Sequence, residues 1–462
     1  MARTMDLTEG SILKKMLIFS LPLIAGNLLQ QFYTVADRIV VGRFAADGAT
    51  ALAAVGATAQ PVNLVLGFFL GIATGASVIC SNMLGSGDKA GLRKNMHTAV
   101  LLALLCGVAM SVITIPLVEV FLRWLGTPES VLGSATRYMQ LYMLGVPASL
   151  VYNVAAGIFR AHGDTKRPMY VLSLSGLVNV ALNLVLVIGF HLDVVGVAIA
   201  TVVSQYLSAG ALTWVLFNAK DQYALTWKEL RLNKKQVGEI LRVGIPSGLG
   251  GIVFSASNLT IQTAVNSFNS TAINSGHATG ASIESFIYMV GMAMQQTSAN
   301  FIGQNVGAKN YRRLRKIGFT CLTCVVVFYA LAGSFVYIFG EPLLGLYIKD
   351  SQEAIQWGML RFSIICPSMV LCAVMDVMGG SLRGLGKATT SMLMSVLGVC
   401  GIRLVWVNTV FRMPQYHTMQ VLYYSFPISW GITMILQLSA FVLLTGKMIK
   451  QWKQEEQQAL NT

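Results

Sequence analysis

Residues 16–41, MLIFSLPLIAGNLLQQFYTVADRIVV, decide how the rest of the chain is interpreted. The stretch is long enough to cross a bilayer, because a membrane-spanning helix needs about 20 apolar residues. It nevertheless contains a carboxylate, Asp37. An acidic side chain at the centre of a membrane costs about 2.5–3.5 kcal/mol on insertion scales, and such residues usually serve a function. Asp37 is therefore the first candidate functional residue.

The polar residues of this stretch share one face of the predicted helix. Asn27, Gln30, Thr34 and Asp37 are spaced i, i+3, i+7 and i+10, which places them in a single stripe. A polar stripe faces protein or water rather than lipid, so Asn27, Gln30 and Thr34 are candidates for a substrate cavity. Pro22 removes a backbone donor inside the apolar run, and we expect a bend of the helix there.

The alternative for Asp37 is a permanent ion pair with a basic neighbour. Arg38 is adjacent in sequence but points about 100° away around a helix, and Arg43 lies beyond the apolar run. No basic residue of this stretch shares the face of Asp37, which favours a functional role.

The composition indicates a polytopic helical membrane protein. Of 462 residues, 55% are hydrophobic and 11% are charged, with a mean hydropathy of +0.63, whereas soluble domains contain about 25% charged residues. The net charge of +14 does not indicate nucleic-acid binding, because the basic residues lie in connections between apolar runs. The seven cysteines lie in apolar runs, so buried thiols are expected rather than a metal site or disulfides.

Apolar runs predict twelve spans, at residues 16–41, 51–84, 95–118, 134–159, 167–190, 194–217, 238–268, 277–305, 317–339, 356–382, 388–411 and 419–447. Counted on alternate sides, 25 of the 33 lysines and arginines fall on the side of the N-terminus, and four fall in loops of the other side. This positive-inside pattern predicts that both termini are cytoplasmic. The expected location is the inner or plasma membrane of a bacterial cell.

The chain is predicted to consist of two repeated halves. The predicted parts are an N-terminal lobe (1–217), a cytoplasmic linker (218–237), a C-terminal lobe (238–447) and a cytoplasmic tail (448–462). Landmarks recur in order at offsets of 218–224 residues, among them Pro22 with Pro246, Pro147 with Pro367, and Arg160 with Arg383. Because six spans separate them, the halves have the same orientation, and parallel repeats of this kind are typical of transporters.

Further polar residues of the first half lie on the predicted fifth and sixth spans. Ser175, Asn179 and Asn183 are spaced i, i+4 and i+8, and the sixth span contributes Thr201. With Asp37 these residues would form an oxygen-rich pocket for a hard monovalent cation such as Na⁺, or, around one buried carboxylate, for a proton. Hydrogen bonding between helices is the alternative role for the amides and hydroxyls.

In the second half, polar residues again share helix faces. The candidates for a substrate cavity are Asn258, Gln262, Glu284, Tyr288 and Asp376. Neighbouring methionines and aromatic rings would suit bulky lipophilic cations, because methionine adapts to varied shapes and rings favour cationic guests. Glu284 is the stronger candidate. Asp376 has an alternative role as an ion-pair partner of Arg383, which is seven residues away.

No catalytic motif is present: the sequence has no P-loop, HExxH or nucleophile elbow. The chain is therefore expected not to be an enzyme, to need no cofactor or resident metal, and to be driven by a gradient of H⁺ or Na⁺ rather than by ATP.

Five segments together resemble the multidrug and toxic compound extrusion (MATE) family, in particular its DinF-like bacterial branch. They are SLPLIAGNLLQQFYTVADRIVVGRF (20–44), IFRAHGDTKRPM (158–169), GVAIATVVSQ (196–205), FIGQNVGAKNYRRLRK (301–316) and SLRGLGKA (381–388). The resemblance implies an all-α fold of twelve transmembrane helices in two six-helix lobes, which are related by a parallel pseudo-two-fold repeat and together form a V, and it implies antiport of drugs against cations.

The resemblance also implies a cation site formed by Asp37, Asn179, Asn183 and Thr201. The family pattern has a second acid where this chain has Asn183. The pocket would then carry one negative charge rather than two, which weakens the case for sodium and leaves proton coupling open.

The sequence thus predicts a monomeric secondary-active exporter of lipophilic, often cationic, small molecules, with membrane lipids and its substrates as its partners and no nucleic acid. Two alternatives remain open. A flippase for lipid-linked precursors would need a strongly cationic cavity, for which Arg403 is the main candidate. A membrane scaffold would have no water-accessible cleft.

Overall fold

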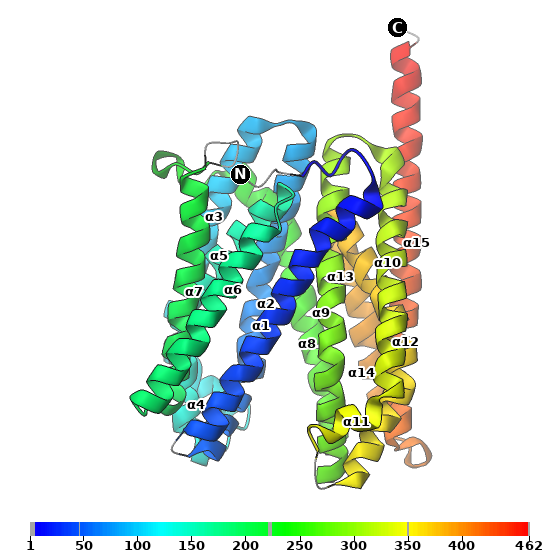
Figure 1. Cartoon of the computed structure of the whole chain (residues 1–462). Coiled ribbons are helices and arrows are strands. Elements are labelled where there is room, and N and C mark those ends of the chain that lie inside the picture. The colour runs from blue at the N-terminus through cyan, green and yellow to red at the C-terminus, as the bar shows by residue number, and fades with distance from the viewer. Residues whose placement is uncertain (1–4, 46, 220–223, 349–350, 461–462) are drawn as a thin grey trace. The chain divides into compact units, whose positions relative to one another are not determined.

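The computed structural model describes residues 5–45, 47–219, 224–348 and 351–460, and these residues form helices joined by short connections, without a strand. Each predicted span corresponds to one helix or to an unbroken or bent helical run. The long helices are α1 (Ile12–Phe44), α2 (Gly48–Ser86), α3 (Lys89–Trp124), α7 (Asp193–Phe217), α8 (Lys234–Asn266), α9 (Thr271–Gly307), α10 (Tyr311–Ile338), α12 (Gln352–Gly384) and α15 (Met419–Leu460) (Figure 1).

The remaining spans are built from shorter pieces. They are α4 (Glu129–Leu144) with α5 (Val146–Ala161), α6 (Lys166–Asn183) with the π-helical segment Leu184–Gly189, and α13 (Ala388–Ser395) with the π-helical segment Val396–Gly401 and α14 (Ile402–Asn408). α4 and α5 meet at a bend of 44°. Each π-helical segment lies in the fifth span of its half of the chain. Single π-turns often occur near functional sites.

The helices have the length and apolar character of membrane spans. Among the described residues, ten helices are long and apolar enough to cross a bilayer, or eleven when α4 and α5 are counted as one broken span. The eighth predicted span, α9, is the one left out of this count, and its 37 residues include many small and polar ones. Several of its polar side chains do not face lipid, because they are buried inside the protein: Glu284, Thr297, Ser298 and Asn305.

The chain divides into two compact units whose boundaries differ from the predicted lobes. The first unit contains Met1–Asp6 and Leu21–Gly248, and the second contains Leu7–Ser20 and Leu249–Thr462. Both boundaries inside helices lie within two residues of a proline, Pro22 in α1 and Pro246 in α8. The start of each of these helices therefore belongs to the other unit, which the sequence pattern did not predict.

Leu7–Ser20 is held in the second unit by specific contacts. The Leu7 N–H donates to Oε1 of Gln304 at 3.0 Å, and Nδ2 of Asn305 donates to the Leu7 carbonyl at 3.1 Å. The Phe19 ring packs edge-on against Phe301 with 5.5 Å between centroids. Leu7 and Phe19 are fully buried, so these contacts explain why Leu7–Ser20 packs with the second unit.

The described part of the predicted linker packs against a neighbouring helix, and the predicted tail extends the last helix. Residues 220–223 of the predicted linker lie outside the described residues, but the rest of it packs against α3. The Thr226 N–H donates to Nε2 of His97 at 2.9 Å, and Glu229 pairs with Arg93. The predicted tail is continuous with the last span, because α15 remains helical to Leu460 (Figure 1).

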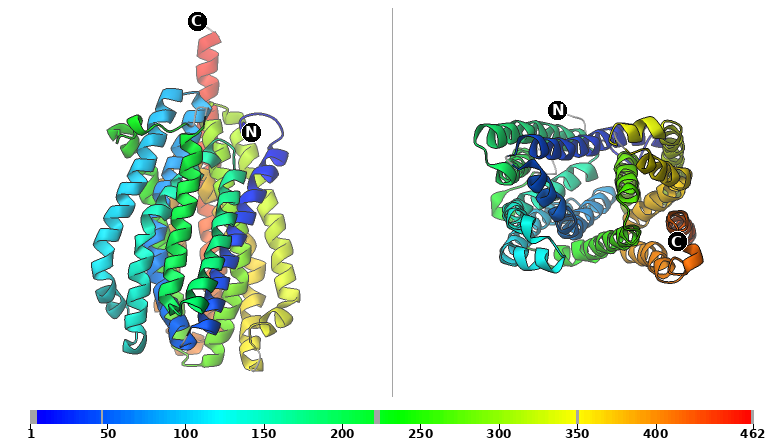
Figure 2. Two further views of the ribbon diagram at one scale, coloured as in Figure 1. Left: turned by 60° about the vertical axis from the view of Figure 1, so that its left-hand side comes forward. Right: turned by 90° about the horizontal axis from the view of Figure 1, so that it is seen from below.

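Within the first unit, α5 is the central helix and packs against α2, α3 and α7. Helix α6 lies alongside α7, as the views of Figures 1 and 2 show. Within the second unit, α12 is central and packs against α9, α10 and α15. The central helices are the most buried parts of their units. Their burial leaves the outer helices to supply the apolar surface that faces lipid.

Close contact of α2 with the start of α8 depends on glycine. A Cβ atom on Gly71 would overlap the Gly244 carbonyl and the Gly248 amide, and one on Gly75 would overlap the Ile240 carbonyl. The obstructing atoms are backbone, so no rotamer change relieves the overlap. Small residues permit this kind of approach between membrane helices.

We predict that Gly71→Ala destabilises the protein by about 1–3 kcal/mol through overpacking, seen as a lower melting temperature of the purified protein in detergent. Gly67→Ala on the same helix is the matched control, because a Cβ atom there has nothing within 4 Å. Equal melting temperatures for the two variants would contradict the described packing.

A candidate cation site in the first unit

The site is positioned by the contact between the second part of α1 and α6. The Tyr33 hydroxyl donates to the Ser173 carbonyl at 2.9 Å. The Tyr33 ring occupies the space that a side chain would fill at Gly176, so the helices approach closely there. One turn beyond Tyr33 on α1 is Asp37, and two turns beyond Gly176 on α6 is Asn183. The same contact therefore brings these two side chains together.

Asp37, Asn183, Asn179 and Thr201 form one hydrogen-bonded chain across α1, α6 and α7. Nδ2 of Asn183 donates to Oδ1 of Asp37 at 2.5 Å and also to Oδ1 of Asn179 at 3.3 Å. Nδ2 of Asn179 donates to Oγ1 of Thr201 at 3.5 Å, and the Thr201 hydroxyl donates to the Val197 carbonyl. The proximity expected from the sequence is therefore observed, while the role of these residues stays a prediction.

The charge of Asp37 has no basic partner among the described residues: no lysine, arginine or histidine nitrogen is within 4.0 Å. Arg38 is exposed, whereas Asp37 is half-buried and Asn183 is fully buried. Oδ1 of Asn183 is buried and has no hydrogen-bond partner in this part of the chain. The cluster therefore offers one carboxylate and several neutral oxygens, and the permanent ion pair considered for Asp37 is not present.

The rest of the polar stripe of α1 is more open. Asn27 is half-buried, and Gln30 and Thr34 are exposed. The Thr34 hydroxyl donates to the Gln30 carbonyl of its own helix at 3.0 Å. The stripe thus begins half-buried at Asn27, is open at its middle, and ends at the buried amide of Asn183, which contacts Asp37.

In the second unit, Glu284 has a partner that the sequence analysis missed. Its carboxylate accepts two hydrogen bonds from Arg361, at 3.0 and 2.7 Å, and is fully buried. Nη1 of Arg361 contacts Nδ1 of His277 at 3.1 Å, and that nitrogen also contacts the Tyr423 hydroxyl. A solitary arginine inside the predicted span 356–382 was the available signal, because such a residue needs a counter-charge.

The other candidates of the second unit have different hydrogen-bond and ring partners. Asp376 accepts from Nε2 of Gln295 at 3.5 Å, and among the described residues it makes no ion pair within 4.0 Å, with Arg383 or otherwise. Gln262 donates to Asn266 and Asn274, and Asn258 accepts from Arg403. Tyr288 packs edge-on against Trp430.

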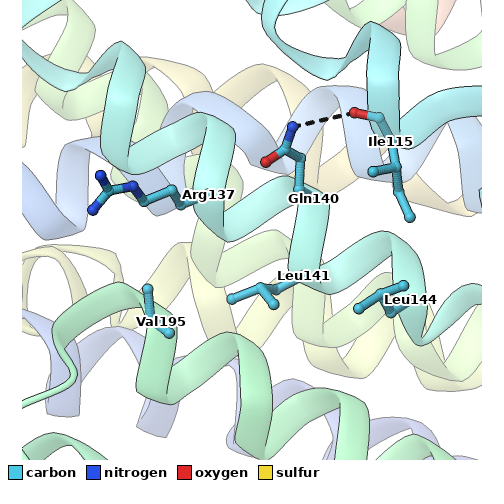
Figure 3. A pocket seen from close by; sticks show the side chains of 6 residues that line it. All are labelled: Ile115, Arg137, Gln140, Leu141, Leu144 and Val195. Atoms are coloured by element: carbon cyan, nitrogen blue, oxygen red, sulfur yellow. Dashed lines mark hydrogen bonds between the residues drawn. The ribbon is translucent and has the colours of Figure 1, made fainter.

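In the part of the chain that the structure describes, neither a metal-binding group nor the cavity described below contains the predicted site residues of the second unit. The described residues contain no group of three or more His, Cys, Asp or Glu side chains able to hold a metal ion. A cavity of about 300 Å³ lies between α3, α4 and α7, with Arg137 at one side and apolar walls (Figure 3). Its lining residues are Ile115, Arg137, Gln140, Leu141, Leu144 and Val195, none of which was predicted as a site residue.

The fold and the repeat define a helical membrane transporter built from two similar halves. The family model described as MatE matches the chain twice, at residues 22–185 and 246–407. The chain therefore belongs to the MatE family, the multidrug and toxic compound extrusion transporters, and the predicted repeat and fold class are confirmed.

Individual relatives agree along most of the chain. The probable multidrug resistance protein YoeA of Bacillus subtilis (strain 168) is 24% identical over 94% of both chains. The probable multidrug resistance protein NorM of Thermotoga maritima is 26% identical over 85% of this chain and 84% of its own. A crystal structure of MATE in complex with MaL6 has a TM-score of 0.90 at 19% identity, covering 97% of this chain and 100% of the other, which shows the fold.

We predict that Glu284→Gln destabilises the protein by about 3–5 kcal/mol, because it leaves Arg361 buried without a counter-charge. The double variant Glu284→Gln/Arg361→Met should recover a large part of the loss. Melting temperatures of the two variants in detergent test this. A stable Glu284→Gln variant with weakened substrate binding would instead support the cavity role expected from the sequence.

Proposed function

We propose that the protein is a secondary-active antiporter that exports lipophilic cations and uses Asp37 as the exchange site for the coupling ion. The observation that supports this most directly is the unpaired Asp37 carboxylate, held by Asn183 and linked to Asn179 and Thr201. A buried carboxylate without a cationic partner is unfavourable unless a cation or a proton neutralises it.

Asn183 favours a proton over Na⁺ as the coupling ion. Its amide donates to Asp37 and so stabilises the ionised carboxylate. After a turn of the amide, the unpaired Oδ1 could accept the O–H of a protonated Asp37. A sodium ion is better held by several oxygens with more negative charge, and this cluster contains a single carboxylate.

The binding of a coupling ion can drive export only if it favours one conformation over another. Neutralising Asp37 changes the balance between states in which the site is open and states in which it is covered. One elementary charge moved across 100 mV supplies about 2.3 kcal/mol, which corresponds to roughly 50-fold in concentration.

The relatives support export of drugs, because YoeA, NorM and the Staphylococcus aureus protein MepA are named as multidrug resistance or multidrug export proteins. The distribution of lysine and arginine supports cytoplasmic termini. The flippase alternative gains no support, since Arg361, one of the two buried arginines among the described residues of the second unit, is neutralised by Glu284.

We predict that Asp37→Asn abolishes gradient-driven uptake of a fluorescent lipophilic cation into inverted membrane vesicles, because the neutral side chain cannot exchange a proton or Na⁺. Uptake is measured with a proton gradient and with a sodium gradient imposed separately. The proposal expects the wild type to respond to the proton gradient.

Asp47→Asn is the matched control. It removes the same charge outside the spans, where Asp47 caps α2 through Thr50 and asparagine caps equally well. Undiminished uptake by Asp37→Asn, at wild-type protein levels, would refute the exchange site, and uptake driven only by sodium would refute the proton assignment.

A further inference from the structure

The second unit contains a buried guanidinium whose charge has no partner. Arg403 of α14 is fully buried. No carboxylate of the described residues lies within 4.0 Å of it. Arg361 in the same unit is also buried, but its charge is balanced by Glu284 at 2.7 Å. Arg403 is therefore the one of these two arginines that still needs a counter-charge.

The contacts of Arg403 are with neutral groups and leave one of its three nitrogens without an acceptor. Nε donates to the Ser429 hydroxyl and Nη1 to Oδ1 of Asn258, both at 3.2 Å. The guanidinium lies 4.2 Å from the ring centroid of Phe426 and 5.8 Å from that of Trp430. Nη2 is buried and has no hydrogen-bond partner among the described residues.

A second donor beside it is also unused. Nε1 of Trp430 is buried without a partner in the described part of the chain. A buried donor without an acceptor costs about 1–3 kcal/mol, and more when it carries charge. Two such donors on neighbouring side chains, one of them cationic, are complementary to an anion that accepts from both.

The internal repeat gives an independent reason to expect a site here. Asn258 follows Asp37 by 221 residues, and Arg403 follows Asn183 by 220, both within the range of 218–224 found for the repeat landmarks. In each half of the chain, a side-chain nitrogen on the fifth span donates a hydrogen bond to a side-chain oxygen on the first span of the same half. Asn183 donates to Asp37, and Arg403 donates to Asn258. An amide replaces the carboxylate and a guanidinium replaces the amide, so the polarity of the second site is reversed.

We propose that Arg403 and Trp430 form a binding site for a small singly charged anion, either a halide or a carboxylate group. The anion accepts from the two donors without a partner, Nη2 of Arg403 and Nε1 of Trp430, and it replaces the Asn258 oxygen as the acceptor for Nη1. Asn258 is exposed, so we expect an anion to approach the guanidinium by displacing this amide. The site is distinct from Asp37 and does not depend on the coupling ion assigned to it.

The test uses the full chain, purified in detergent, and measures its melting temperature at constant ionic strength. Chloride, bromide or formate progressively replaces isethionate, a larger sulfonate. A ligand that binds only the folded state stabilises it by RT ln(1 + [L]/Kd). The wild type is expected to show a saturable rise in melting temperature with the small anions.

Arg403→Gln is expected to remove this rise, because it removes the charge. Trp430→Phe keeps the charge and the ring but removes one donor, so the midpoint concentration should increase about tenfold. Arg137→Gln is the control, because it removes an exposed arginine of the first unit and should leave the midpoint unchanged. If Arg403→Gln does not fold, the midpoint of Trp430→Phe decides the test.

The different salts distinguish which kind of anion binds. A rise with chloride and bromide alone identifies an inorganic halide, and a rise with formate identifies a carboxylate, such as one carried by a small-molecule ligand. Melting temperatures of the wild type that are the same in all anions would overturn the proposal, since water would then satisfy both donors. A midpoint that is unchanged in Trp430→Phe would overturn it as well.

Discussion

The arrangement of this protein depends on the cost of keeping charge inside a membrane. Charged side chains are buried or half-buried at three places, and they are stabilised in two different ways. Glu284 and Arg361 neutralise each other through two hydrogen bonds in the interior of the second unit. Among the described residues, Asp37 in the first unit accepts from an amide and makes no ion pair, and Arg403 in the second donates to an amide and a hydroxyl, lies over an aromatic ring and makes no ion pair. A matched pair is a structural element, whereas a charge without a partner calls for a mobile ion.

Helix packing determines where these charges lie. The absence of a side chain at Gly176 lets the Tyr33 ring pack against α6, and this fixes Asp37 beside Asn183. In the same unit, Gly71 and Gly75 let α2 approach the start of α8. Small residues bring the backbones close, and polar side chains one or two turns away then meet.

Much of the fold could be predicted from the sequence, because apolar length and the distribution of basic residues are local properties. The spans, the repeat and the cluster of Asp37 with Asn183, Asn179 and Thr201 all follow from spacing and from the family resemblance. The partner of Glu284 could not be read in this way, since Arg361 is 77 residues distant and only packing selects it. The boundaries beside Pro22 and Pro246 were missed for the same reason, because long-range contacts such as that of Leu7 with Gln304 decide them.

In the proposed transport cycle, Asp37 exchanges a proton for a cationic substrate. The most direct measurement is the number of protons released when tetraphenylphosphonium binds the purified protein, obtained by calorimetry in buffers of different ionisation enthalpy. We predict that about one proton is released per bound cation in the wild type and none in Asp37→Asn. Binding without proton release in the wild type, or equal release in both proteins, would contradict it.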